Sequence, residues 1–244
     1  MIPLRDANPT RRAPVVTIGL IAVCLAVFAG ELLVRSSEGD VGLARLFREY
    51  GLVPADLTAA VGGRGAPLPG ALWPLLTSLF VHADILHIGF NLLFLWIFGN
   101  NVEDRLGRPA FLVFYLAGGL VAAAAQVMAG PDSTVPIIGA SGAIAAVLGA
   151  YLVLYPRARV LSLVYFGLFF QLLRLPAVVL LGLWFLVQLV SAAAGPGPAD
   201  GGGVALFAHL GGFVLGLAVG LVLRGAGSAG RTRSLRPSDR LGVG

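Results

Sequence analysis

Six long apolar runs limit what this chain can fold into. Five of them are long enough, or nearly so, to form one helix through the hydrocarbon core of a bilayer, which takes about 20 residues, and the fourth is shorter. With 57% hydrophobic and only 12% charged residues, the chain is far more apolar than a soluble domain, in which about 25% of residues are charged. We therefore expect an all-α polytopic membrane protein with six helices, at 14–34, 84–102, 109–128, 141–155, 176–193 and 204–223.

The arginines predict the orientation of these helices. All seventeen basic residues are arginine. With six spans, the only ones on the side opposite the termini are Arg35, Arg45, Arg48 and Arg64, all in one long first loop. The positive-inside rule then puts both termini in the cytoplasm. We expect a multi-pass protein of the bacterial inner membrane type. Because the arginines are scattered between apolar runs and form no basic face, nucleic acid is not an expected partner.

The chain divides into three parts. Residues 1–13 are expected to form a cytoplasmic segment, 14–223 the membrane domain, and 224–244 a disordered, arginine-rich cytoplasmic tail. The apolar stretch 159–173 lies between two arginines and reads as an interfacial connection into the fifth helix. The single cysteine, Cys24, excludes an intrachain disulfide and cysteine-rich metal sites.

The fourth apolar run is too short to cross a bilayer. The stretch from Ser141 to Tyr155 would form a helix of roughly 22 Å at about 1.5 Å per residue, whereas the hydrocarbon core is about 30 Å thick. If Arg157 marks the inner surface, Ser141 lies several Å below the outer one. Non-helical backbone at that depth must be surrounded by protein or line a water-filled cavity. We therefore expect a re-entrant loop before this helix, with Ser141 at its start.

Three other polar residues fall at the same depth. His209 begins the last apolar run, and Arg224 closes it fifteen residues later. His87 and Asn91 stand four residues apart, on one face of the second helix, and precede the charge at Glu103 by a similar distance. A lone serine in a membrane helix usually bonds its own backbone, but intramembrane ionisable groups are functional by default. The convergence of four such residues on one level favours a site.

The chemistry of these residues suits acyl transfer. A serine needs a base to take its proton, and histidine is the usual one. His87, Asn91 and the backbone N–H of Ser141 can donate to an oxyanion. Since the nearest aspartates lie closer to the surface, the pattern predicts a Ser141–His209 dyad. Small residues at steps of four on the two helices that bear the dyad predict that these helices pack closely: Ser141, Ala145 and Gly149, and Gly212, Gly216 and Gly220.

The motifs "HADILHIGFN", "GASG" and "AHLGGFVLG" together resemble the rhomboid intramembrane serine proteases. The resemblance covers about residues 14–223 and implies a rhomboid-like six-helix bundle that hydrolyses a peptide bond in or near a substrate's transmembrane helix. It implies transmembrane proteins as substrates and no metal or cofactor. By the match, Ser141 is the nucleophile, His209 the general base and acid, and His87, Asn91 and the Ser141 backbone the oxyanion hole. The matching residues with supporting roles are His82, Gly139, Gly142, Gly212 and Gly216.

Two positions depart from the family pattern. Many members have Trp-Arg in the first loop, where this chain has Trp73-Pro74. Members also often have Tyr or Phe four residues after the nucleophile, stacked on the catalytic imidazole, and here that position is Ala145. The sequence does not identify what holds His209 instead.

Three other function classes stay open. A metal-dependent membrane hydrolase could use three histidines, but HExxH is absent and no carboxylate shares their depth. A transporter could use a short broken helix, although no inverted repeat is visible. A non-catalytic membrane chaperone of the same fold would bind helices without cutting them. The oligomeric state and the substrate are not indicated by the sequence.

Overall fold

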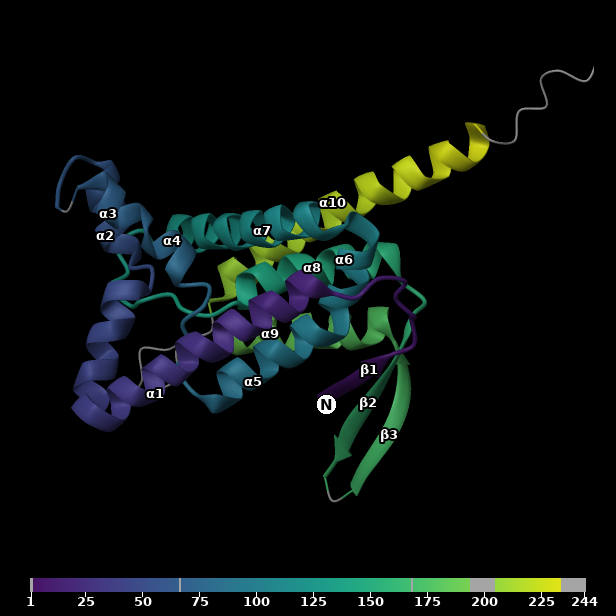
Figure 1. Cartoon of the computed structure of the whole chain (residues 1–244), viewed down its shortest axis with the longest axis horizontal. Helices are drawn as coiled ribbons and strands as arrows, with labels where there is room; N and C mark the ends of the chain where they lie inside the picture. The colour runs from purple at the N-terminus through teal and green to yellow at the C-terminus, as the bar shows by residue number, and fades with distance from the viewer. Residues whose placement is uncertain (1, 66, 168, 194–204, 234–244) are drawn as a thin grey trace, which may run out of the picture.

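The computed structural model describes residues 2–65, 67–167, 169–193 and 205–233, most of which are helical (Figure 1). The stretches long and apolar enough to cross a membrane are Val15–Tyr50, Ile85–Leu106, Arg108–Ala129 and Leu206–Gly225, and Ser141–Leu154 and Ala177–Val187 are shorter apolar helices. The helical elements are α1 (Val15–Tyr50), α2 (Pro54–Val61), α3 (Leu68–Leu72), α4 (Pro74–Thr77), α5 (Ile85–Phe94), the π-helical turn η1 (Leu95–Gly99), α6 (Asn100–Leu106), α7 (Arg108–Ala129), α8 (Ser141–Leu154), α9 (Ala177–Ala193) and α10 (Leu206–Arg233).

A three-stranded sheet corrects the expectation of an all-α protein. Strands β1 (Ile2–Asp6), β2 (Arg159–Phe166) and β3 (Phe169–Pro176) pair antiparallel in the order β1-β2-β3. The expected interfacial connection at 159–173 is therefore mostly a β-hairpin, and Gly167 between its strands has φ +66°. Backbone groups near a bilayer must be paired, and two equally long apolar strands pair with each other.

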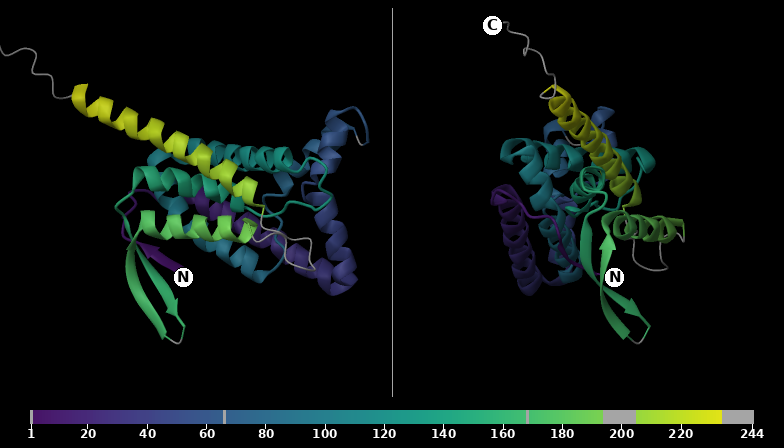
Figure 2. Two further views of the ribbon diagram at one scale, coloured as in Figure 1. Left: turned by 180° about the vertical axis from the view of Figure 1, so that it is seen from behind. Right: turned by 90° about the vertical axis from the view of Figure 1, so that its right-hand side faces the viewer.

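Helix α8 lies at the centre of the bundle, beside α7 and α10 (Figures 1 and 2). All residues from Gly142 to Tyr151 are buried. This explains why α8 is apolar on every side, with small residues where its neighbours come closest. A buried central helix gives the residue at its start a fixed position.

The start of α1 is held by a carboxylate from α6. Helix α1 has no side-chain cap of its own. Glu103, which is 3% exposed, accepts hydrogen bonds from Val16 N at 3.0 Å, Thr17 N at 2.8 Å and Thr17 Oγ1 at 2.7 Å. A carboxylate on the free N–H groups of a helix start also complements the helix dipole. Glu103 therefore fixes the first helix against the second span.

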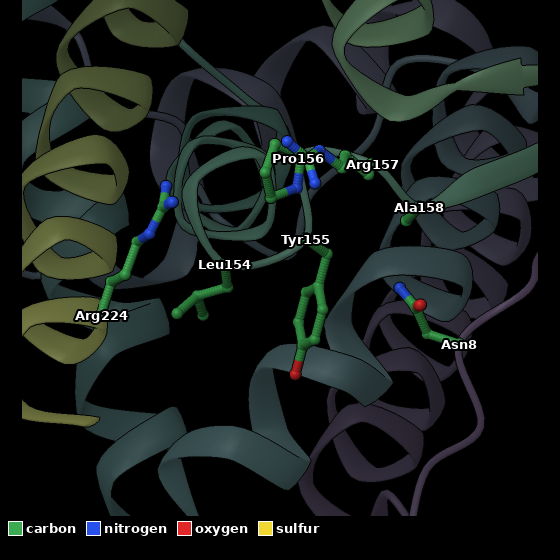
Figure 3. Close-up of a pocket in the computed structure, with 7 residues that line it drawn as sticks. All are labelled: Asn8, Leu154, Tyr155, Pro156, Arg157, Ala158 and Arg224. Carbon is green, nitrogen blue, oxygen red and sulfur yellow. The ribbon is translucent and has the colours of Figure 1, made fainter. Parts of the chain in front are cut away.

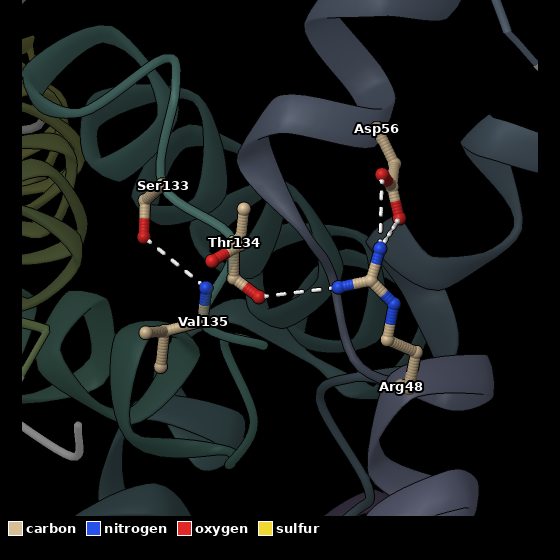
Figure 4. A network of polar contacts seen from close by, with 5 residues as sticks. All are labelled: Arg48, Asp56, Ser133, Thr134 and Val135. Carbon is tan, nitrogen blue, oxygen red and sulfur yellow. Dashed lines mark hydrogen bonds and ion pairs between the residues drawn. The ribbon is translucent and has the colours of Figure 1, made fainter.

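The segment 130–140 before α8 is tied to the first loop. Arg48 forms an ion pair with Asp56 at 3.0 Å and donates to the Thr134 carbonyl at 3.3 Å (Figure 4). Leu52 and Ile137 pair as an isolated β-bridge. Whether this segment is re-entrant in the bilayer stays a prediction, but its backbone is anchored close to α8.

Two helices extend beyond their expected ends. Helix α1 continues past residue 34 to Tyr50, with a break at Gly39, where φ is +68°. Helix α10 continues to Arg233, so that residues 224–233 of the expected disordered tail are helical. The last residues of that tail, 234–244, lie outside the described part of the chain. In both cases the helix runs on past its apolar stretch into polar sequence.

Candidate active site

Ser141 and His209 lie within hydrogen-bond distance of each other, although 68 positions separate them in the sequence. The Ser141 Oγ is 2.7 Å from the His209 Nε2. Ser141 is the first residue of α8, and His209 lies in the first turn of α10. His209 is only 5% exposed, so the imidazole is largely shielded from solvent. The expected helix start at Ser141 is confirmed.

Close packing between α8 and α10 brings these two side chains together. A Cβ atom added to Gly212 would overlap the carbonyl oxygen of Gly142, and one added to Gly216 would overlap that of Ala146. A Cβ on Gly149 would overlap the Phe213 carbonyl oxygen. The close helix contact predicted from the small residues is therefore confirmed. Larger residues at these positions would push His209 away from Ser141.

His87 and Asn91 both approach the backbone just before Ser141. A Cβ on Gly139 would lie 2.6 Å from His87 Nε2 and 3.7 Å from Asn91 Nδ2, and Gly139 has φ +112°. Only glycine fits such a place. The N–H of Ala83 donates to His87 Nδ1 at 3.4 Å, which favours the neutral tautomer with its proton on Nε2. The proton then lies on the nitrogen nearest Gly139.

The side-chain amide of Asn91 is available as a hydrogen-bond donor. Asn91 is buried, with 6% of its surface exposed, and its side chain makes no hydrogen bond to another described residue. Such a group fits a place where a substrate oxygen or a water supplies the partner.

The ring of His82 packs against the ring of His87. Its ring lies edge-on to the ring of His87, with centroids 5.2 Å apart. His82 is fully buried; its N–H donates to Glu31 of α1 at 3.1 Å, and its Nδ1 lies 3.0 Å from the Phe80 carbonyl oxygen. Glu31 was not predicted to be part of this support. A glutamate inside the first apolar run was its only signal.

Asp84 caps the helix that presents His87 and Asn91. Its Oδ1 accepts from Leu86 N at 2.8 Å and from His87 N at 2.9 Å. Asp84 is one of the aspartates that lie too near the surface to orient His209, and its function as a helix cap was not predicted. An aspartate directly before an apolar run is a common N-cap signal, so this function could have been recognised.

A tryptophan from α9 lies against the imidazole of His209. The ring centroids of Trp184 and His209 are 5.6 Å apart at an interplanar angle of 42°. Trp184 also lies 6.3 Å from Phe94 of α5. The position where relatives often have an aromatic residue, Ala145, is fully buried. A Cβ atom added to Gly212 would lie 3.4 Å from the Cβ of Ala145. In this chain the aromatic ring beside the imidazole comes from a different helix.

We expect Ala145→Tyr to destabilise the protein. The phenol has no room between α8 and α10, and overpacking of this kind costs typically about 1–3 kcal/mol. Thermal unfolding in detergent micelles should show a lower Tm for the tyrosine variant, while the control Ala145→Ser keeps the parent value. A tyrosine variant with unchanged Tm and faster substrate cleavage would show that the packing leaves space for a second ring.

Other parts of the molecule do not compete with this site. Among the described residues, no group of three His, Cys, Asp or Glu side chains lies together as a metal site would require. A cavity of about 680 Å³ lies at the other end of α8, lined by Leu154, Tyr155, Arg157 and Arg224 among others (Figure 3). A helix of fourteen residues is about 21 Å long, so this cavity is remote from Ser141.

A model of the Rhomboid domain family matches residues 69–226. The matched range includes every candidate site residue. Among curated proteins, the chain is 43% identical over 83 residues to "Rhomboid protease GluP" of Bacillus subtilis, which covers 34% of this chain and 16% of that protein. It is 31% identical over 172 residues to "Rhomboid protein 1, mitochondrial" of Saccharomyces cerevisiae, covering 68% and 46%. It is 34% identical over 83 residues to "Putative rhomboid protease YdcA" of Bacillus subtilis, covering 34% and 41%. The chain thus spans less than half the length of each of these relatives.

Proposed function

The chain belongs to the rhomboid family, and we propose that it is a serine endopeptidase that cuts a peptide bond in or near a transmembrane helix of other membrane proteins. The observation that supports this most directly is the 2.7 Å contact between Ser141 Oγ and His209 Nε2. A nucleophile within hydrogen-bond reach of its base is the geometric requirement for covalent catalysis. The six-span topology with both termini in the cytoplasm is part of the same proposal.

The first half of the reaction forms an ester. His209 Nε2 takes the proton of Ser141 while its Oγ attacks the scissile carbonyl carbon, and the carbonyl oxygen becomes anionic. The N–H of Ser141, the Nε2–H of His87 and the amide of Asn91 donate to that oxygen. The tetrahedral intermediate then collapses, and the protonated His209 gives its proton to the leaving amine.

The second half consumes one water molecule. Water loses a proton to His209 and attacks the ester carbonyl carbon, which again passes through an oxyanion. Collapse releases the carboxylic acid product, and the proton returns to Ser141. A cavity below the membrane surface would supply this water while the surrounding helices keep lipid out. The reaction requires no metal or cofactor.

A direct test combines a labelled inhibitor with a defined substrate. Purified protein is incubated with a transmembrane reporter, and the products are identified by mass spectrometry. We expect two fragments separated by one hydrolysed bond, and inhibition by a fluorophosphonate that adds covalently to Ser141. Reporter binding without fragments would instead favour a non-catalytic membrane chaperone. Inhibition by chelators alone would favour a metal-dependent hydrolase.

We further propose that Trp184 positions the imidazole of His209, in place of the ring that Ala145 does not provide. Aromatic ring pairs stabilise an arrangement by about 0.5–1.5 kcal/mol, which corresponds to about 2- to 10-fold in rate. Trp184→Ala should therefore lower kcat by that factor and leave KM unchanged, while Trp184→Phe keeps most of the activity. If Trp184→Ala and Trp184→Phe raise KM equally, the tryptophan contacts substrate instead.

A further inference from the structure

A second cavity lies between the sheet and the second membrane span. Its volume is about 710 Å³, and it is bounded by β1, by one face of β2 and β3, and by η1 and α6. The lining residues that matter most are Arg5, Arg159, Arg174, Asp6, Leu161 and Trp96. Strand β2, which contributes Arg159 and Leu161 to the lining, begins five residues after α8 ends, so this cavity lies toward the opposite end of α8 from Ser141.

Three arginines from three strands meet at one wall of this cavity. Arg5 pairs with Leu161, and Leu161 pairs with Arg174, so the three residues form one row across the sheet. Arg159 lies two residues from Leu161, on the same face of β2. Adjacent strands are about 4.8 Å apart, so the guanidinium groups of Arg5 and Arg174 can reach the same point above Leu161.

This positive cluster has little internal compensation. Among the described residues, none of the three arginines forms an ion pair within 4.0 Å. The one carboxylate in the lining, Asp6, accepts hydrogen bonds from Asn101 at 2.7 Å and Tyr151 at 2.9 Å. Burial raises the pKa of Asp6. Arg5 and Arg174 flank Leu161, and Arg159 lies diagonally from Arg174 across the hairpin. The like charges of these neighbours repel each other, and an anion between them would reduce that cost.

The surroundings of the cluster are those of a lipid interface. Beyond the arginines, the same face of the hairpin exposes Tyr165, Phe170 and Leu172, which are 58%, 67% and 60% exposed. The hairpin projects away from the helix bundle, and its tip lies farthest from the helices (Figures 1 and 2). On the opposite wall, Trp96 is 49% exposed and belongs to a stretch apolar enough to span a membrane. Aromatic side chains in such positions are typical of the boundary between head groups and acyl chains.

We infer that this cavity binds the phosphate head group of an anionic phospholipid through Arg5, Arg159 and Arg174. Guanidinium groups bind phosphate oxygens in a bidentate fork. The acyl chains would lie along Trp96 and the exposed surface of the second span, in the leaflet on the side of the N-terminal strand. The sheet would then be a lateral anchor that holds the start of α9 at the membrane surface. This inference does not depend on the proposed peptidase activity.

The test compares lipid retention by the full chain and two charge variants. The protein is purified in micelles that contain equal parts of phosphatidylglycerol and phosphatidylcholine, and bound lipid is identified by native mass spectrometry. The first variant is Arg5→Gln with Arg159→Gln and Arg174→Gln. The matched control removes the same charge at the same end of the bundle, with the exposed arginines changed as Arg11→Gln, Arg12→Gln and Arg108→Gln.

We expect the parent chain and the control to retain phosphatidylglycerol in preference to phosphatidylcholine. Each arginine near an anionic membrane contributes about 1 kcal/mol, or about 5-fold in affinity, so the triple cavity variant should lose about 100-fold. If that variant does not fold, Arg174→Gln alone should lose about 5-fold. An equal loss in the control would overturn the proposal in favour of general surface charge. Displacement of the lipid by inorganic phosphate at equal concentration would overturn it in favour of a free-anion site.

Discussion

Changing Ser141 or His209 to alanine is expected to remove nearly all cleavage of a transmembrane reporter while the protein stays folded. The serine variant has no nucleophile, and the histidine variant has no group to take the serine proton. Because the pair acts as one unit, either loss should cost about as much as both. In a well-studied soluble serine protease, such a loss lowers kcat by about 10⁶-fold. We expect the rate to fall below the detection limit of a gel or mass spectrometric assay.

The control for this prediction is another serine in a membrane-type helix. Ser36 of α1 donates to the carbonyl oxygen of Leu33 at 2.8 Å, which is the usual role of such a hydroxyl. Ser36→Ala should leave cleavage unchanged. Comparable activity in the Ser141→Ala and Ser36→Ala variants would exclude the proposed nucleophile. Circular dichroism and Tm of all variants separate loss of catalysis from loss of fold.

The central part of the candidate site could be predicted because it depends on depth and helical periodicity. Ser141 and His209 each begin an apolar run of a length that can be counted from the next arginine. His87 and Asn91 share a face because they are four residues apart. Glycine and alanine at steps of four predicted the contact between the helices. Each of these patterns is local. It can be recognised without knowing which other segment of the chain packs against the helix.

The sheet could not be predicted in the same way. Strand recognition from sequence relies on alternation between polar and apolar residues, and β2 and β3 are apolar on both faces for most of their length. Strand β1 pairs with residues more than 150 positions away, from Ile2 to Leu163. Only Gly167, between two short apolar runs, pointed to a turn. Strands that are apolar on both faces lack the alternation by which strands are usually recognised in a sequence.

The ring beside His209 was missed for a related reason. Trp184 is one of several large apolar residues in α9, and nothing in its local sequence distinguishes it from a lipid-facing side chain. Its position depends on how α9 packs against α5 and α10, which is a tertiary property. The length of α1 was also underestimated, because the charged residues after position 34 suggested a loop. They are exposed and partly paired with one another, as in the ion pairs Arg35–Asp40 at 3.1 Å and Arg45–Glu38 at 3.2 Å.

Asn91→Ala is expected to lower kcat by about 10²–10³-fold, which corresponds to about 2.7–4 kcal/mol for one oxyanion donor. The amide would donate to an oxygen that becomes anionic only during acyl transfer, so KM should change little. The native fold should also be nearly unaffected, because the Asn91 side chain makes no hydrogen bond to another described residue.

Asn101 provides the matched comparison. It belongs to the same helical stretch and is 2% exposed, and its amide donates to Asp6 and to Asn100, both at 2.7 Å. Asn101→Ala should therefore lower Tm and leave kcat near the parent value. A polar contact between membrane helices averages only about 0.6 kcal/mol, so neither change should unfold the protein. If Asn91→Ala instead behaves like Asn101→Ala, with lower Tm and normal kcat, Asn91 holds helices together and the oxyanion must be stabilised by the two remaining donors.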